Sequence, residues 1–459
     1  MPFDPTLAAI RFGVGLSPNI APPSSVDAMM DRLRGPDEIG ALVKIPTSAD
    51  VYPSANDHRL ASIALNEVRG TDGEAAAEEH RLTMRAEGRE AVGAYLRAEL
   101  ARSAHTTDGF RERLVRFWGD HFTVRASNAI SRNLISPYVE TAIRPYLAGN
   151  FADMLVAAVS SPMMILYLDQ HRSMGPNSRA AQSNGLGLNE NLAREILELH
   201  TLGVGGRYSQ NDVREFAELL TGLTASARRG AYYRSQMAEP GSETVLGITY
   251  GGREESMDHV VEVLRDLAVH PDTARHLARK LAVHFIAPEP DAAMIEEMAD
   301  AYLAANGELT ALYDEMLRSD SAWGAQLEKV KQPFDFISSA VRALGIPLEV
   351  IQGATLQQTR RLIQRPLSVM GQDWQSPVGP DGWPEEEDNW ITPQGMAGRI
   401  TWSMQAPRDM LQDLPDPREF VFDALGPTPA DEVIFAAGAA ETVSDGVGIV
   451  LASAAFQRR

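Results

Sequence analysis

Apolar residues recur at spacings of three and four positions along most of the chain, and stretches that alternate apolar with polar residues are few. Because an α-helix has 3.6 residues per turn, this spacing gathers apolar side chains on one helical face, whereas a half-buried strand would need alternation. The sequence therefore predicts an all-α or mainly α fold, a large multi-helix globular bundle. The predicted helices are residues 26–34, 57–68, 74–104, 108–122, 136–158, 190–202, 210–222, 257–268, 271–286, 291–305, 308–318, 333–344, 355–363 and 430–441.

Two segments depart from the helical pattern. Aromatic and β-branched residues between glycine-rich ends predict a small β-hairpin insertion near residues 230–250. A Pro/Gly/Trp-rich loop near residues 371–395, here called the tryptophan loop, contains Trp374, Trp383 and Trp390. Such a loop either wraps a core or forms a rigid aromatic wall of a binding cleft.

The length of the chain bears on its division into lobes. Its 459 residues exceed the roughly 250–300 that one hydrophobic core usually spans. We predict a single large helical unit over residues 1–459, with an N-terminal lobe at 1–105, a central core at 106–345 and a C-terminal lobe at 346–459.

The charge and cysteine content exclude several classes of function. The chain has 62 acidic and 42 basic residues, and its formal net charge of −20 argues against binding to nucleic acid. It has no cysteine, which excludes disulfides, thiolate ligands and a thiol nucleophile. Neither a secretory signal nor a membrane-length apolar stretch is recognised, so we expect a cytoplasmic protein without membrane insertion.

The densest pattern lies between Leu186 and Thr224, here called the signature segment, which contains Asn-Glu-Asn-Leu-Ala-Arg-Glu-Ile-Leu-Glu-Leu-His-Thr. On a helix at 190–202, steps of 100° place Asn191, Glu195 and Glu198 on one face and His200 on the opposite side. A histidine partner for these carboxylates must then come from another helix. If they are buried, they must be paired with cations, protonated or bound to a metal.

Two further residues are candidates for the same site. His121, in the run Phe-Trp-Gly-Asp-His-Phe, is predicted either as a general base or metal ligand or as a hydrogen-bonded core residue. Asp169 opens a polar loop, where it either holds the loop or joins Glu195 as a second carboxylate.

A cationic face is predicted on the helix at 271–286. His276, Lys280 and His284 follow one another at four-residue intervals there. They would meet an anionic substrate, or Lys280 would neutralise the carboxylates of the signature segment.

These motifs together resemble the bacterial domain-of-unknown-function 1800 family. The Asn-Glu-Asn run, the Phe-Trp-x-x-His-Phe run and the Pro-x-Gly-Trp-Pro of the tryptophan loop carry the resemblance, with Asp120 where Asn is more common in the family. The resemblance implies a mainly helical protein but no established reaction. Many relatives are thought to be exported, which leaves export as an alternative location.

Two hypotheses of function follow. In the first, Glu195, Glu198, His121, Asp169 and Asn191 form a site for metal-assisted or general acid–base chemistry on an unknown substrate, with a divalent metal as its cofactor in the metal-assisted form. In the second, the chain is a non-catalytic partner or scaffold. The resemblance implies a partner for this role from the family numbered 1501, which is similar to the alkaline phosphatase and sulfatase superfamily.

Overall fold

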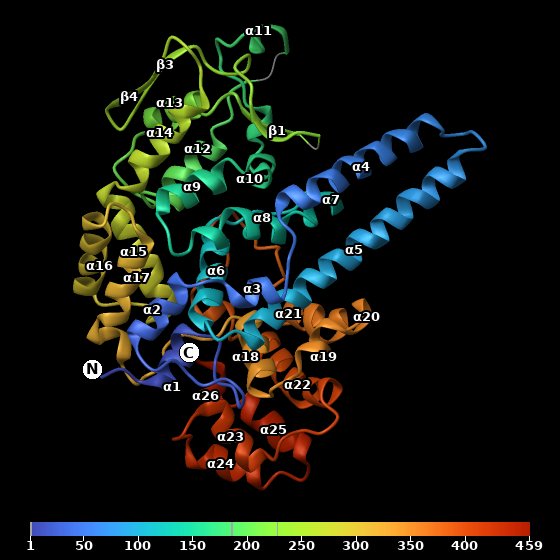
Figure 1. Ribbon diagram of the computed structural model, residues 1–459, viewed down its shortest axis with the longest axis vertical. Coiled ribbons are helices and arrows are strands. Elements are labelled where there is room, and N and C mark those ends of the chain that lie inside the picture. The colour runs from blue at the N-terminus through green and yellow to red at the C-terminus, as the bar shows by residue number, and fades with distance from the viewer. Residues whose placement is uncertain (1, 185–186, 227) are drawn as a thin grey trace.

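The computed structural model describes residues 2–184, 187–226 and 228–459 and consists mainly of helices (Figure 1). The described strands form two small antiparallel sheets. The predicted fold class, mainly α with a small β insertion, is therefore confirmed. Leu186, the first residue of the signature segment, lies outside the described residues.

The largest hydrophobic core of the described residues, core 1, contains apolar side chains between residues 7 and 323. Apolar positions at helical spacing supply its inward faces, as the sequence predicts. Its elements are α1 Pro5–Leu7, η1 Ala8–Phe12, α2 Val26–Arg34, α6 Gly109–His121, α8 Ile135–Ala142, α9 Phe151–Val159, α10 Pro162–Tyr167, α12 Asn191–Glu195, η4 Ile196–His200, α13 Gln210–Leu219, α14 Met257–Ala268, α15 Pro271–Phe285, α16 Ala292–Ala304, α17 Leu309–Arg318 and η5 Asp320–Trp323.

The second core, core 2, joins the segment 39–104 to the chain from residue 334 onward. Its elements are α3 Glu38–Leu42, α5 Glu74–His105, α18 Pro333–Ala343, α19 Leu348–Gln352, η6 Arg360–Gln364, α21 Arg365–Val369, α22 Pro393–Met410, α23 Pro417–Leu425, α24 Asp431–Gly438, α25 Val443–Ala452 and α26 Ala454–Gln457. The remaining short helices are α7 Ala129–Arg132, η2 Arg144–Tyr146, η3 Gln170–Arg172, α11 Ala181–Asn184, α20 Leu356–Thr359 and η7 Glu387–Asn389.

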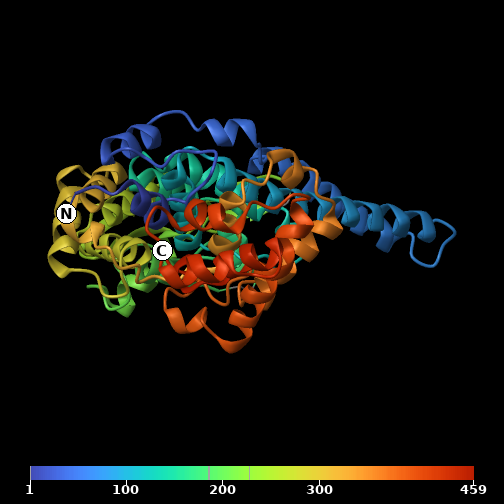
Figure 2. The ribbon, with the colours of Figure 1, turned by 90° about the horizontal axis from the view of Figure 1, so that it is seen from below.

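Helices α4, Ser48–Glu67, and α5 form an arm that projects from the body of the molecule (Figures 1 and 2). The buried residues of α5 begin only at Gly93, so its first half belongs to the arm and its second half to core 2. Helix α4 begins earlier than predicted, because Thr47 and Asp50 form a capping box. In the arm, α4 and α5 pack against each other and little else, so apolar side chains such as Leu60 and Leu82 are exposed.

One predicted helix, 136–158, is two helices. Helix α8 ends at Ala142 and α9 begins at Phe151. Pro145 lies between them and cannot donate a helical hydrogen bond, and the Asn150 side chain caps α9 by accepting from the Ala152 backbone at 2.9 Å.

The predicted β insertion contains two hairpins rather than one. Strand β2, Gly230–Tyr233, pairs antiparallel with β1, Leu223–Ser226, which precedes the predicted insertion. Strand β3, Gly241–Val245, pairs antiparallel with β4, Ile248–Gly252. Leu246 and Gly247 make the tight turn of the second hairpin, both with positive φ.

Helices α22, α23 and α25 were not among the predicted helices. Gly395, Gly398 and Pro407 weaken the helical pattern of α22, but its packing against α25 stabilises both helices. The apolar stretch at 446–456 falls within α25 and α26 and lies in core 2. No helix in the described part of the chain is both long and apolar enough to cross a membrane.

Candidate functional site

The helix of the signature segment differs from the one predicted. An α-helical turn, α12, leads directly into the π-helix η4, and the wider π turn changes which residues share a face. Leu192, Ile196 and Leu197 are fully buried, whereas Glu195 and Glu198 are half-buried and Asn191 is exposed. The predicted polar face therefore lies toward the surface.

Ion pairs within the same helix satisfy part of this face. Arg194 lies 3.3 Å from Glu198 and 3.1 Å from Glu190, each one turn away. Glu195 has no ion pair within 4.0 Å among the described residues, and partial burial followed by the charges of Glu198 and Asp381 raises its pKa.

The structure brings His121 to the signature segment. Its Nε2 donates to the backbone oxygen of His200 at 3.1 Å, and the two imidazole rings lie 5.8 Å apart. His276 donates to the Leu199 oxygen at 3.0 Å. Burial lowers the pKa of all three histidines, to about 3 for His200 and about 4 for His276, so they are neutral near pH 7.

Asp169 is placed apart from these groups. It is exposed at the start of η3 with a φ of 55°, and its ion-pair partner is Arg172, at 3.9 Å. No hydrogen bond or ion pair joins it to Glu195 in the residues that the structure describes. The carboxylates whose charges act on Lys280 are Asp120, Glu385 and Asp381, and not Glu195 or Glu198, although Lys280 does act on the pKa of His200 in the signature segment.

The tryptophan loop closes over α6 at Asp120. The backbone N–H of Trp383 donates to both carboxylate oxygens, at 3.0 and 3.1 Å. Gly382 has a φ of 84°, and a Cβ at this position would lie 2.6 Å from Asp120 Oδ2. Only glycine therefore lets the loop approach the carboxyl group this closely.

Behind the loop is a cavity of about 170 Å³ between α5, α6, α8 and α18. Five carboxyl groups line it: Glu99, Glu112, Asp120, Glu140 and Asp335. Three of them have arginine partners: Glu112 with Arg144 at 2.5 Å, Glu140 with Arg102 at 2.6 Å, and Asp335 with Arg116 at 3.0 Å.

The other two, Glu99 and Asp120, have no cation within 4.0 Å in the described part of the chain. Among the described residues, Glu99 accepts hydrogen bonds from neutral donors only: Ser136 at 2.8 Å, Trp374 Nε1 at 3.0 Å and Gln375 Nε2 at 3.4 Å. Burial raises the pKa of Glu99 to about 7 and that of Asp120 to about 7. The cavity thus holds two carboxyl groups that can exchange a proton near neutral pH.

Gln375 of the tryptophan loop adds a sign of local strain. Its φ is 56°, in the left-handed region that residues other than glycine rarely adopt. Its side chain donates to Ser136 at 2.6 Å and to Glu99 at 3.4 Å. Residues held in such conformations cluster at active sites and ligand clamps, which is consistent with a functional cavity here.

A second polar group supports the cavity wall. His284 lies 2.5 Å from Glu385 of the tryptophan loop through Nδ1, and its Nε2 accepts from Arg113 at 2.9 Å. Lys329 binds the same Glu385 carboxylate at 2.9 Å. Because both ring nitrogens of His284 are occupied, this histidine positions the loop and is not a free base.

Residues 8–458 match the sequence model of a family described as "Protein of unknown function (DUF1800)". The chain belongs to the DUF1800 family. No curated protein and no solved structure matches it. The family segments meet in one place in this DUF1800 protein: α6 contacts the signature segment through His121 and the tryptophan loop through Asp120.

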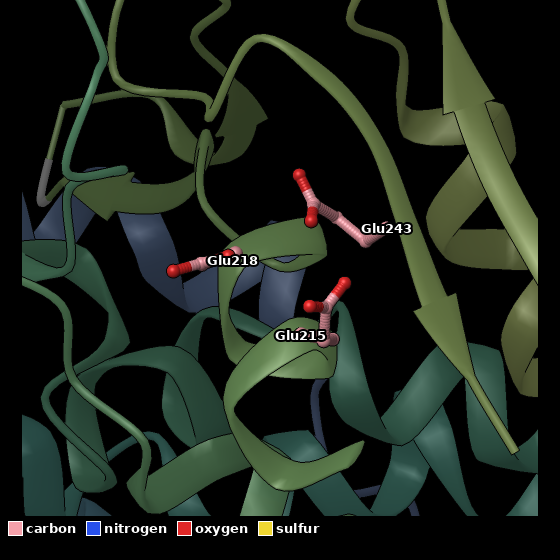
Figure 3. A group of neighbouring side chains, drawn as sticks. All are labelled: Glu215, Glu218 and Glu243. Carbon is pink, nitrogen blue, oxygen red and sulfur yellow. The ribbon is translucent and has the colours of Figure 1, made fainter. Parts of the chain in front are cut away.

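Metal-type donors gather at a different place. Glu215 and Glu218 of α13 and Glu243 of β3 have carboxylate oxygens within 4.8 Å of one another (Figure 3). Glu243 is buried, and burial together with the two neighbouring carboxylates raises its pKa to about 7. Within the described residues, the predicted set of His121, Asp169, Glu195 and Glu198 does not gather in this way.

The sequence did not predict Glu99 as a site residue, and it marked Asp120 only as a position where the family more often has Asn. Glu99 lies in the buried half of a long helix among residues that read as ordinary core positions, and its cavity partners come from distant segments, so its neighbours in sequence give no sign of a cavity. One feature of the sequence could have identified Asp120 as a site residue, because an ionisable side chain stands there where the family more often has an amide.

Proposed function

We propose that the protein is an enzyme that performs general acid–base catalysis in the cavity behind the tryptophan loop, with Asp120 and Glu99 as its catalytic residues. One observation carries the proposal. Of the five carboxyl groups that line the cavity, only these two form no ion pair within 4.0 Å among the described residues, and both have pKa values near 7. A group is most effective in proton transfer when its pKa lies near the working pH.

The surroundings support different roles for the two groups. Asp120 is held at both oxygens by one backbone N–H, which fixes its orientation toward a reacting atom. Glu99 shares a network of neutral donors, Ser136, Trp374 and Gln375, that can follow its change of charge. Arg116 lines the same cavity, and its buried Nε–H has no acceptor among the described residues, so it could bind a developing negative charge.

The proposal moves the site away from the set predicted from sequence. Asn191 and Asp169 are exposed, and Glu198 already has an ion-pair partner. Glu195 is the member of that set with the best remaining support, because Asp381 of the tryptophan loop acts on its pKa. The metal-assisted form of the hypothesis stays a prediction, and metal analysis of the purified protein tests it.

Carboxyl titration tests the assignment directly. We expect ¹³C NMR of carboxyl-labelled protein to show Glu243 and two further groups that titrate near pH 7. Of these two, one should be lost in Asp120→Asn and the other in Glu99→Gln. The exposed Asp169→Asn variant is the control and should leave both titrations unchanged. Two cavity carboxyls that titrate below about pH 5, the ordinary range, would sink the proposal.

Catalysis is tested on a panel of ester, phosphoester and glycoside substrates. For any substrate that is turned over, each of the two cavity variants should lower kcat by about 10²–10⁴-fold, the usual contribution of an acid or base. Asp169→Asn should have no effect.

A second candidate function has an observation of its own. The arm of α4 and α5 projects from the body and exposes apolar side chains, as a surface for a protein partner would. It supports the role of a non-catalytic partner, for which the family resemblance suggests a protein of the family numbered 1501. Co-purification that is lost on replacing Leu60 and Leu82 with Ser, with the cavity variants still binding, would favour this role.

A further inference from the structure

A groove of about 640 Å³ lies at the base of the arm, outside the cavity. Helices α4 and α5 form one side, and the segment 126–133, α20, η6 and Trp374 form the rest. Gly88 and Gly93 bring α5 close to the other side, since a Cβ on Gly88 would lie 2.6 Å from the Asn133 side chain and one on Gly93 2.6 Å from Leu356. Two glycines inside a helix each cost about 1 kcal/mol relative to alanine, and here close approach explains them.

The charge of this groove is opposite to that of the protein. Its charged lining residues are five arginines, and it has no Asp or Glu, although acidic residues outnumber basic ones in the chain by 62 to 42. Arg81 is paired with Glu78. The other four, Arg85, Arg89, Arg132 and Arg360, have no carboxylate within 4.0 Å among the described residues.

Arginines that form no ion pair, on both sides of a groove, suit a particular ligand chemistry. Guanidinium groups bind the oxygens of phosphate and sulfate groups through paired hydrogen bonds. Because the arginines come from α5, α7 and η6, one small phosphate would not reach them all, whereas a molecule with two or more such groups would. The volume is in the usual range for a small-molecule site.

The groove and the cavity share one wall residue. Trp374 lines both, and its Nε1 donates to Glu99 at 3.0 Å. The cavity, at about 170 Å³, has room only for the reacting end of a substrate. The groove has room for the rest.

We propose that the groove at the base of the arm binds the anionic part of the substrate, a small molecule that carries two or more phosphate or sulfate groups, and that Trp374 separates this part from the reacting end in the cavity. The link to the cavity rests on the proposed function. The binding of the anion does not, because it depends on the arginines alone.

Isothermal titration calorimetry of the full chain tests the proposal with two probes, pyrophosphate and sucrose octasulfate, which separate phosphate from sulfate recognition. We expect saturable binding of at least one probe, weakened about tenfold or more in the double variant Arg89→Gln/Arg132→Gln. Arg279→Gln is the matched control, because Arg279 is an exposed helical arginine that forms no ion pair with any described residue and does not line the groove, and this variant should bind like wild type. Binding should also weaken as salt is raised.

Several results would overturn the assignment. These are no binding of either probe, equal binding by wild type and the double variant, or tighter binding of a single-stranded oligonucleotide than of both probes, which would make the groove a nucleic-acid site. Asp120→Asn and Glu99→Gln separate the two proposals. They should leave probe affinity within about twofold, so normal binding together with unaltered catalysis in these variants would reject the cavity chemistry and keep the groove.

Discussion

Two carboxylate-rich regions of the molecule, the helix of the signature segment and the cavity behind the tryptophan loop, differ in how their charges are balanced. On the signature helix, Arg194 lies between Glu190 and Glu198, one turn from each, and all three side chains are half-buried. In the cavity, arginines from distant segments pair with three carboxyl groups, while Glu99 and Asp120 form no ion pair within 4.0 Å in the described part of the chain. The difference teaches that a dense sequence motif can mark a place where helices pack together. Buried carboxyl groups without an ion pair are the better guide to a site for proton transfer.

The largest effect is expected from removing a cation of the cavity wall. Arg144 is buried between Asp37 and Glu112, and both carboxylates depend on it. Arg144→Met should cost about 3–5 kcal/mol of unfolding free energy, because it leaves buried charges unpaired. Chemical denaturation measures this. If Arg144→Met lowered the unfolding free energy by less than about 1 kcal/mol, the comparison would fail, because the ion pairs of the cavity wall would then be as exposed to solvent as those of the signature helix.

The next effect is a dependence of stability on pH. Asp120 and Glu99 have folded-state pKa values of about 7, above the ordinary unfolded values, so both states hold the proton at low pH. As pH rises from about 4 to about 7, the unfolded state ionises first and the folded state loses stability, on the order of 2–4 kcal/mol per group. Glu99→Gln and Asp120→Asn should each remove part of this loss. Denaturation curves at pH 5 and pH 8 that shift equally in wild type and variants would contradict it.

A smaller effect is expected where the tryptophan loop touches Asp120. Gly382→Ala adds both backbone strain at positive φ and a clash with the carboxyl group. Gly205→Ala is the control, because Gly205 has a similar φ of 81° and no atom within 4 Å of an added Cβ. The control should lose about 1 kcal/mol, and Gly382→Ala about 1–3 kcal/mol more. Equal losses would show that the loop can retreat from Asp120.

The smallest effect is expected on the signature helix. Glu198→Gln removes an i,i+4 pair with Arg194 whose side chains are about a third exposed, and it should cost less than about 0.5 kcal/mol. Glu195→Gln should be neutral or slightly stabilising, since burial and the charge of Glu198 already disfavour its ionised form. Thermal unfolding of the two variants sharpens the comparison, and a loss above about 2 kcal/mol in either would restore the signature helix as a buried network.

Local sequence rules predicted the helical class and most helix positions, because amphipathic spacing and caps act within a few residues. They failed where tertiary packing determines the local structure. The examples are the π-helix at Ile196–His200, the pairing of β2 with the preceding strand β1, and the glycine-containing α22, which α25 stabilises. The site was harder still. Glu99 and Trp374 are 275 positions apart, and no local pattern records that they share a hydrogen bond.

The continuity of α5 has a mechanical consequence. One uninterrupted helix runs from Glu74 at the tip of the arm, past Arg89 in the groove, to Glu99 at the cavity. At 1.5 Å per residue this is about 37 Å of nearly rigid rod. Whatever binds the tip of the arm is therefore joined by one continuous helix to Glu99, whose carboxylate accepts from the Trp374 indole at 3.0 Å.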